Sequence, residues 1–170
     1  MKAIVDDSEL ATEVQANIVQ GLNKLVPEYP YYHWRNLQDS IKKASEQYYR
    51  DKNYYTAFAE AVKQYTQAVR TKSGSVNPND RSLMQEVFSG KKLKVSAKYK
   101  KRDGTNFSDS TMQNIETGQQ LLSEGIVAGC RNPVAHEEFI ELKETGLFSE
   151  KDCLDALSLL SHLFRRLDDA

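Results

Sequence analysis

Apolar residues spaced three and four apart dominate this chain and restrict what it can fold into. In such a stretch one face of a helix becomes apolar, and that helix is stable only when the face is buried. Turn-forming residues separate the stretches, which cover residues 8–25, 37–49, 54–69 and 80–88, a run from Ser108 or Ser110 to Arg131, and a final helix after Ser149. The spacing predicts an all-α protein in which several amphipathic helices pack around one core.

Length and cysteine content favour one domain without a metal or a disulfide framework. A chain of 170 residues can bury a substantial core but is short for two ordinary domains, so we expect a single domain over residues 1–170. Cys130 and Cys153 lack the paired spacing of a zinc site, and we expect both to be buried free thiols. There is no glycine-rich nucleotide loop in the sequence, and we expect neither a cofactor nor a metal.

The charge balance excludes a globally basic surface. The formal net charge is -1 and the isoelectric point is near 6.3, so any binding of nucleic acid would depend on a local patch or on assembly. Asp6, Asp7 and Glu9 stand where a signal peptide would need a basic region, and no apolar run is long enough to span a bilayer. We therefore expect a cytoplasmic protein with no membrane partner.

Residues 90–107 differ from the rest of the chain in spacing and in charge. Apolar or aromatic residues occupy every second position, at Leu93, Val95, Ala97 and Tyr99. This two-residue repeat predicts an exposed strand or extended arm, and Asp103-Gly104 predicts a hairpin turn. We expect a short β-hairpin or an extended basic insertion in the helical bundle.

The basic residues of this insertion have two interpretations. Lysines keep an exposed edge strand soluble, which is the interpretation that we favour from the residues alone. In the alternative, the insertion is an arm that contacts the phosphates of RNA. The RNA-binding residues would then be Lys94, Lys98, Lys100, Lys101 and Arg102.

Residues 129–138 go beyond what a helical core needs. Their sequence is Gly129-Cys130-Arg131-Asn132-Pro133-Val134-Ala135-His136-Glu137-Glu138. Pro133 cannot continue the preceding helix, whereas Asn132 suits an N-cap and Pro133 suits a first helical position. The segment therefore predicts that a new helix begins directly after Arg131. Arg131 and His136 would then contact each other across the start of that helix.

An arginine and a histidine beside the free N–H groups of a helix start would form a phosphate-handling site. Arginine binds two phosphate oxygens with its planar fork, and histidine exchanges a proton near neutral pH. The alternative is a capped helix break whose Arg131 and His136 merely face solvent. From these residues alone we favour the alternative, because short motifs often occur without a function.

A family resemblance reverses that preference. The motif Arg-Asn-Pro-Val-Ala-His in a helical bundle resembles the HEPN superfamily, and the core G-x-R-N-P-x-A-H is similar to that of its Ymh/Abi-type bacterial branch. Residues 48–57, 69–74 and 83–88 also resemble segments of this branch. The resemblance covers roughly Ile41 to Asp168 and implies a single HEPN-like domain. The N-terminal helix and connection of residues 1–36 lie outside it.

HEPN proteins of this kind are commonly metal-independent endoribonucleases of toxin, abortive-infection and other antiphage systems, and they act as dimers. The resemblance implies that Arg131 and His136 are the catalytic pair and that Asn132 positions them. It also implies RNA as the substrate and an antitoxin or a defence-system protein as a partner. Glu138 stands where the antitoxin-paired HepT branch has a tyrosine, which argues against a partner of the same kind.

The chemistry of RNA cleavage is consistent with this expectation. Attack by the 2′-OH needs a base, an acid and positive charge on the phosphorane, and it needs no metal. One motif supplies one histidine, so we expect a symmetric homodimer with a shared active site. Two alternatives remain open: a HEPN-like dimer that binds RNA, a nucleotide or a protein without cutting, and a purely structural subunit of a defence assembly.

Overall fold

The computed structural model describes residues 33–168 and residue 170, and the chain divides into two compact units, 1–35 and 36–170. Of the first unit the structure describes residues 33–35, which are helical. The predicted helix over residues 8–25 and most of the connection after it lie outside the described residues. All that follows concerns residues 36–170.

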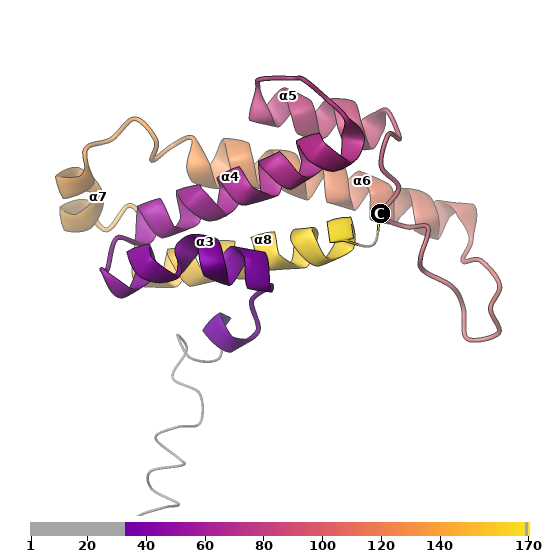
Figure 1. Ribbon diagram of the computed structural model, residues 1–170, viewed down its shortest axis with the longest axis horizontal. Coiled ribbons are helices and arrows are strands. Elements are labelled where there is room, and N and C mark those ends of the chain that lie inside the picture. Colours follow the sequence, from indigo (N-terminus) through magenta and orange to yellow (C-terminus); the bar gives the residue numbers. More distant parts are fainter. Residues whose placement is uncertain (1–32, 169) are drawn as a thin grey trace, which may run out of the picture. The chain divides into compact units, whose positions relative to one another are not determined.

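This second unit is an all-α bundle, as the apolar spacing predicted (Figure 1). Its elements are α3 (Asp39–Arg50), α4 (Tyr54–Ser73), α5 (Asp80–Met84), the π-helical turn η1 (Gln85–Ser89), α6 (Asp109–Gly125), the π-helical turn η2 (Ile126–Arg131), α7 (Phe139–Thr145) and α8 (Glu150–Asp168). Helix α4 packs against α3 and α8, while α6 packs against α5, η1 and α8. No helix in the described part of the chain is both long and apolar enough to cross a membrane.

Local capping explains where these helices begin and end. The side chain of Asn53 accepts a hydrogen bond from the N–H of Thr56 at 3.2 Å, and Ser108 Oγ accepts one from the N–H of Thr111 at 3.3 Å. Each of these bonds satisfies an N–H that has no partner within its helix. Helix α7 ends at Gly146, whose φ of 68° lies in the left-handed region that glycine adopts without strain. Of the two starts predicted for the helix that reaches Arg131, Ser108 is confirmed.

The core lies between α4, α6 and α8. Helix α8 buries one complete face, with Leu154, Leu157, Leu160, Leu163, Phe164 and Leu167. A polar network joins the three helices inside this core. The hydroxyl of Tyr65 lies 2.7 Å from Ser123 Oγ and accepts a hydrogen bond from Gln119 Nε2 at 3.0 Å. Gln119 Nε2 also donates to the carbonyl of Leu163 at 3.1 Å, so one amide ties α6 to both neighbours.

The strand predicted within residues 90–107 is not confirmed. The described residues contain no regular strand, and a single antiparallel bridge joins Lys100 to Asn106 around a turn at Gly104. Val95 and Ser96 are neighbours in the sequence and are both buried. Their N–H groups donate to the carboxylate of Glu116 on α6, at 3.3 Å and 2.8 Å. The two-residue alternation fails because α6, and not a second strand, satisfies this backbone.

Candidate functional site around Arg131

Arg131 lies at the end of a helix and not before the start of one. Helix α6 continues through η2, and the N–H of Asn132 donates to the carbonyl of Val127 at 3.0 Å, the long-step bond of a π-helical turn. Asn132 has the helical φ and ψ values of -66° and -40°. Residues 132–136 then form turns, and α7 begins only at Phe139. The predicted N-cap at Asn132 is therefore wrong.

The preceding helix explains this error. An N-cap residue needs an extended backbone, but Asn132 is held in helical geometry by its bond to η2. Pro133 ends the series of helical backbone hydrogen bonds, as predicted, because it has no N–H to donate. The chain then turns before it can form another helix. Arg131 and His136 consequently do not flank a helix start, and the anion site expected from free N–H groups there is not formed.

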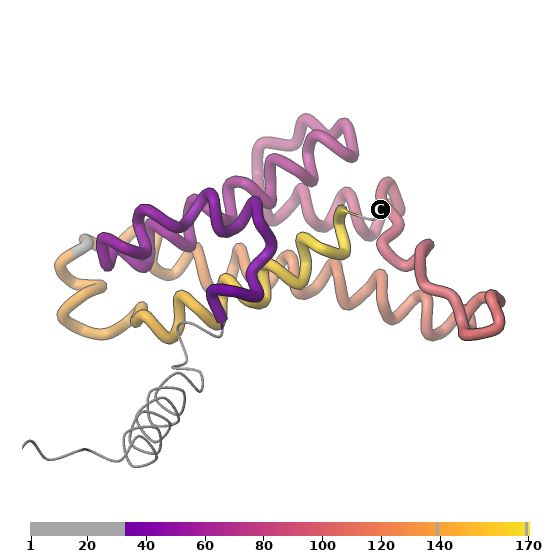
Figure 2. Tube along the Cα trace, turned by 60° about the horizontal axis from the view of Figure 1, so that its bottom comes forward, coloured from indigo at the N-terminus to yellow at the C-terminus, as the bar shows by residue number. Residues whose placement is uncertain are grey.

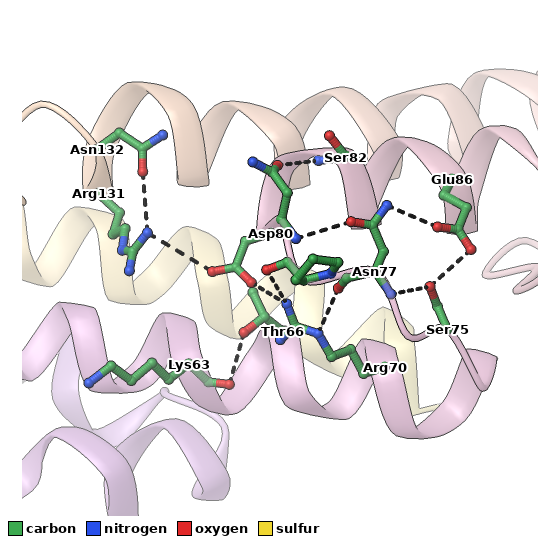
Figure 3. Close-up of polar contacts among 12 residues, drawn as sticks. Lys63, Thr66, Arg70, Ser75, Asn77, Asp80, Ser82, Glu86, Arg131 and Asn132 are labelled. Carbon is green, nitrogen blue, oxygen red and sulfur yellow. Dashed lines mark hydrogen bonds and ion pairs between the residues drawn. The ribbon is translucent and has the colours of Figure 1, made fainter.

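The side chain of Arg131 is held by oxygen atoms on two sides (Figure 3). Its Nη1 donates to Asn132 Oδ1 at 3.4 Å and lies 4.0 Å from Asp80 Oδ2. The other carboxylate oxygen of Asp80 accepts a hydrogen bond of 2.6 Å from Arg70 Nη2. Asp80 thus lies between two guanidinium groups. The side chain of Arg131 is 32% exposed and that of Asp80 is 20% exposed, so the pair lies at the edge of the bundle.

Asp80 is held in place by a polar network that continues behind it. Arg70 on α4 also donates to the backbone carbonyls of Asn77 and Pro78, at 3.1 Å and 3.2 Å. Asn77 Nδ2 donates to Glu86 Oε2 on η1 at 3.0 Å, as Figure 3 shows. The loop before α5 is therefore fastened to α4 and to η1, and it presents Asp80 to Arg131.

The other predicted catalytic residues are exposed. Asn132 and His136 both face solvent in the turns after η2. Asn132 contacts Arg131 through the hydrogen bond described above. The motif of Arg131, Asn132 and His136 thus occupies one short segment at the surface.

An apolar groove of about 400 Å³ lies beside the motif. It runs between the motif, the segment before α8 and the first half of α8, and is lined by Gly129, Cys130, Pro133, Val134, Leu147, Phe148, Asp152, Asp155, Ala156 and Leu159. Leu147 is 54% exposed. Burial raises the pKa of the Cys130 thiol, which keeps it protonated and a poor nucleophile. Burial also raises the pKa of Cys153, to about 12.

The basic residues predicted to contact RNA lie elsewhere. Lys94, Lys98, Lys100, Lys101 and Arg102 are all exposed, and all precede the start of α6. The Arg131 motif follows the far end of the same helix (Figures 1 and 2). The 17 residues of α6 span about 26 Å at roughly 1.5 Å per residue. One chain therefore does not bring the basic segment and the motif together.

Sequence reasoning missed Asp80 and Arg70 as members of this site. Arg70 was noted only within a segment that resembles the family, and Asp80 only as the start of a short helix. Their contact with Arg131 joins parts of the chain that are far apart in the sequence, and no local spacing signals it. In the described residues, no group of three or more His, Cys, Asp or Glu side chains is arranged to hold a metal ion.

The fold and the motif together define an all-α protein with an Arg-Asn-Pro-Val-Ala-His segment at a π-helical end. A family model described as a protein of unknown function (Hypoth_ymh) matches residues 35–167. This match covers most of the chain, so the chain belongs to the Hypoth_ymh family, and the Ymh-type part of the resemblance is confirmed. No curated protein and no solved structure matches the chain.

Proposed function

We propose that this chain is a HEPN-type, metal-independent endoribonuclease, acting as an effector in a toxin or antiphage-defence system. The observation that carries this proposal is that the Arg131 side chain is both contacted by neighbouring oxygen atoms and partly exposed. Its guanidinium is steadied by Asn132 and Asp80, yet a third of the side chain, 32%, stays exposed next to a surface turn that ends at His136. A cation that is oriented but accessible suits a phosphate clamp.

Asp80 does not neutralise Arg131 fully. The carboxylate is bound closely by Arg70 at 2.6 Å, whereas Arg131 lies 4.0 Å away. Coulomb attraction falls with distance, so Arg70 is the main partner of Asp80. Arg131 therefore keeps positive charge for the phosphate of a bound RNA and for the phosphorane that forms during cleavage.

His136 supplies the proton transfer. As a base it takes the proton from the 2′-OH, whose oxygen attacks the adjacent phosphorus and displaces the 5′-oxygen. The displaced oxygen takes a proton from an acid, which is the His136 of a second copy of the chain. The products are a 2′,3′-cyclic phosphate and a 5′-hydroxyl. DNA has no 2′-OH and resists cleavage.

The apolar groove beside the motif supports the second copy. Four of its lining residues, Gly129, Cys130, Pro133 and Val134, belong to the motif segment itself. A two-fold dimer formed through this groove brings the motif of one copy next to the motif of the other. Exposed Leu147 supplies apolar area for that contact.

The test uses an RNA oligonucleotide and the same sequence with a single 2′-deoxy position. Wild-type protein is expected to leave 2′,3′-cyclic ends and to spare the deoxy position. His136→Ala is expected to slow cleavage by roughly 10²–10⁴-fold and to keep RNA binding. Arg131→Ala is expected to lose cleavage too, because the guanidinium that would bind the phosphate is removed. Arg81→Ala removes an arginine that is 64% exposed and paired with Glu124, and it is the matched control.

Two results would count against the enzyme. Wild-type protein that binds RNA but leaves it intact favours the binding module. Unchanged biological effect and assembly in both Arg131→Ala and His136→Ala favour the structural subunit. If His136→Ala cuts as fast as wild type, the histidine is not the proton carrier.

The dimer is tested separately. Leu147→Asp places a charge in the groove, so we expect a monomer by sedimentation and a matching loss of cleavage. Val76→Asp changes a residue that is 95% exposed and outside the groove, and this control variant is expected to remain dimeric and active. If the Leu147→Asp protein is still a dimer, the dimer interface lies on another surface of the chain.

A further inference from the structure

A second cavity, of about 400 Å³, lies near the C-terminal end of α8. Its lining residues are Lys98, Tyr99, His162, Arg165, Arg166 and Asp168. The groove beside the Arg131 motif is lined by the first half of α8, up to Leu159, whereas this cavity is lined by the second half. The two cavities share no residue, so this cavity is a feature separate from the proposed nuclease site. We name it the α8 pocket.

The α8 pocket carries an excess of positive charge. Lys98, Arg165 and Arg166 are cationic, and Asp168 is the one carboxylate among the lining residues. Asp168 Oδ2 accepts a hydrogen bond from Gln38 Nε2 at 3.1 Å. Arg165 donates to neutral oxygens, namely Ser161 Oγ at 2.7 Å and the carbonyl of Asn36 at 3.4 Å. Neither Arg165 nor Arg166 has a carboxylate partner in the described part of the chain, so no ion pair neutralises these two guanidinium groups.

Arg166, one of the lining residues, has an unsatisfied hydrogen-bond donor. Its Nε is buried and has no hydrogen-bond partner among the described residues. A buried N–H without an acceptor destabilises a protein. The dipole of α8 favours basic residues in its last turn, but it does not explain a donor that is both buried and unpaired. The guanidinium of Arg166 therefore has donor capacity that the described protein groups do not use.

The pKa of His162 responds to the same excess of positive charge. Burial lowers its pKa, and the nearby charges of Arg166 and Arg165 lower it further. An anion in the pocket would act against the two arginines and raise this pKa. His162 is therefore a built-in probe for anion binding.

We propose that the α8 pocket binds the phosphate group of a small phosphorylated ligand, such as a nucleoside monophosphate. Two arginines, a lysine and an imidazole are the donors that phosphate oxygens accept most readily in proteins. Tyr99 lines the same cavity and offers an aromatic surface for the organic part of the ligand, with Lys98 Nζ 5.2 Å from the centre of its ring. The volume falls in the range of roughly 300–1,000 Å³ that small-molecule sites occupy.

The experiment follows the imidazole signals of His162 by NMR in pH titrations at constant ionic strength. The chain has three histidines, so His33 is an internal reference, and His136 reports separately on the proposed nuclease site. Inorganic phosphate and adenosine monophosphate are each compared with chloride. We expect both phosphates to raise the pKa of His162 saturably. Running the titration in His136→Ala as well makes the result independent of the proposed nuclease.

Arg166→Gln is the test variant, since it removes one charge and the unpaired Nε. We expect it to weaken phosphate binding at least about tenfold, as the loss of one charged hydrogen bond implies. Arg50→Gln is the matched control, because Arg50 is an exposed arginine paired with Glu46 on α3. It is expected to bind like wild type. Lys98→Gln provides a second test if Arg166→Gln does not fold.

Three outcomes overturn the proposal. His162 does not respond to millimolar phosphate or adenosine monophosphate; Arg166→Gln and Lys98→Gln both bind like wild type; or an RNA without terminal phosphate shifts His162 while the monophosphate does not. The last result would assign the pocket to the backbone of a polynucleotide. None of them bears on whether His136 cleaves RNA, so failure here and failure of the nuclease proposal are distinguishable.

Discussion

A single carboxylate, that of Asp80, lies between the guanidinium groups of Arg70 and Arg131. Arg70 binds it closely and also fastens the loop before α5 through two backbone carbonyls. Asp80 is therefore a positioning residue in the proposed function: it steadies Arg131 without touching RNA. Its effect on cleavage should come with an effect on stability, because the same carboxylate holds the loop.

We expect Asp80→Asn to lower the free energy of unfolding by about 1–3 kcal/mol, the usual worth of a partly buried hydrogen bond between charged groups. Urea denaturation measures this loss. RNA cleavage should fall as well, with less effect on RNA binding, because Arg131 keeps its charge but loses its orientation. Asp51→Asn is the control, since Asp51 is exposed and bonded to Gln47. Equal stability of the two variants would contradict the role given to Asp80.

At the scale of secondary-structure elements, Glu86 joins η1 to its surroundings. Its carboxylate accepts hydrogen bonds from Ser75 Oγ at 2.9 Å, from Asn77 Nδ2 at 3.0 Å and from Lys92 Nζ at 2.5 Å. The bond from Lys92, followed by those from Asn77 and Ser75, lowers the pKa of Glu86 from 4.5 to about 2. One side chain thus ties η1 to the loop before α5 and to the segment after it.

A lowered pKa makes this connection sensitive to acid. The stabilisation is fully present above the unfolded pKa of 4.5 and is lost as the pH falls from 4.5 toward 2, because the unfolded chain binds the proton first. We expect Glu86→Gln to be less stable than wild type at pH 7 and to lose less stability on acidification. Urea denaturation at several pH values measures both. Glu46→Gln, an exposed carboxylate paired with Arg50, is the control. Parallel pH profiles for Glu86→Gln and wild type would refute the prediction.

Across residues 36–170, α6 separates the proposed catalytic motif from the basic segment. Lys100, Lys101 and Arg102 lie in the loop before this helix, and Arg131 lies after it (Figure 2). A short RNA bound at the motif does not reach the loop of the same chain across about 26 Å of helix at ~1.5 Å per residue. A long RNA is needed to contact both.

We expect replacement of Lys100, Lys101 and Arg102 by glutamine to weaken binding of a long single-stranded RNA and to leave cleavage of a dinucleotide unchanged. If all three residues contact phosphates, the slope of log K against log salt should decrease by about 2. Fluorescence anisotropy at several salt concentrations measures it. The control replaces Lys42, Arg50 and Lys63, three basic residues paired with carboxylates on α3 and α4. The same loss in both variants would indicate a general charge effect and no RNA-binding arm.

Local signals in the sequence predicted the helices well. The apolar spacing of α8 is confirmed, as is Ser108 as the start of α6. These features depend on side chains a few residues apart and on backbone groups of the same helix, which the sequence contains in full. The motif from Arg131 to His136 was visible for the same reason, since its residues are contiguous.

The sequence by itself determined an all-α chain, most helix boundaries and the place of the Arg131 motif. Only the tertiary structure decided how Asn132 folds, that Val95 and Ser96 pack on α6 without a partner strand, and that Asp80 holds Arg131. Each of these depends on a specific partner: the helical turn that accepts the N–H of Asn132, the carboxylate of Glu116 on α6, or the carboxylate of Asp80 at the start of α5. Their energies are set by three-dimensional proximity, and proximity between distant residues is not contained in local spacing.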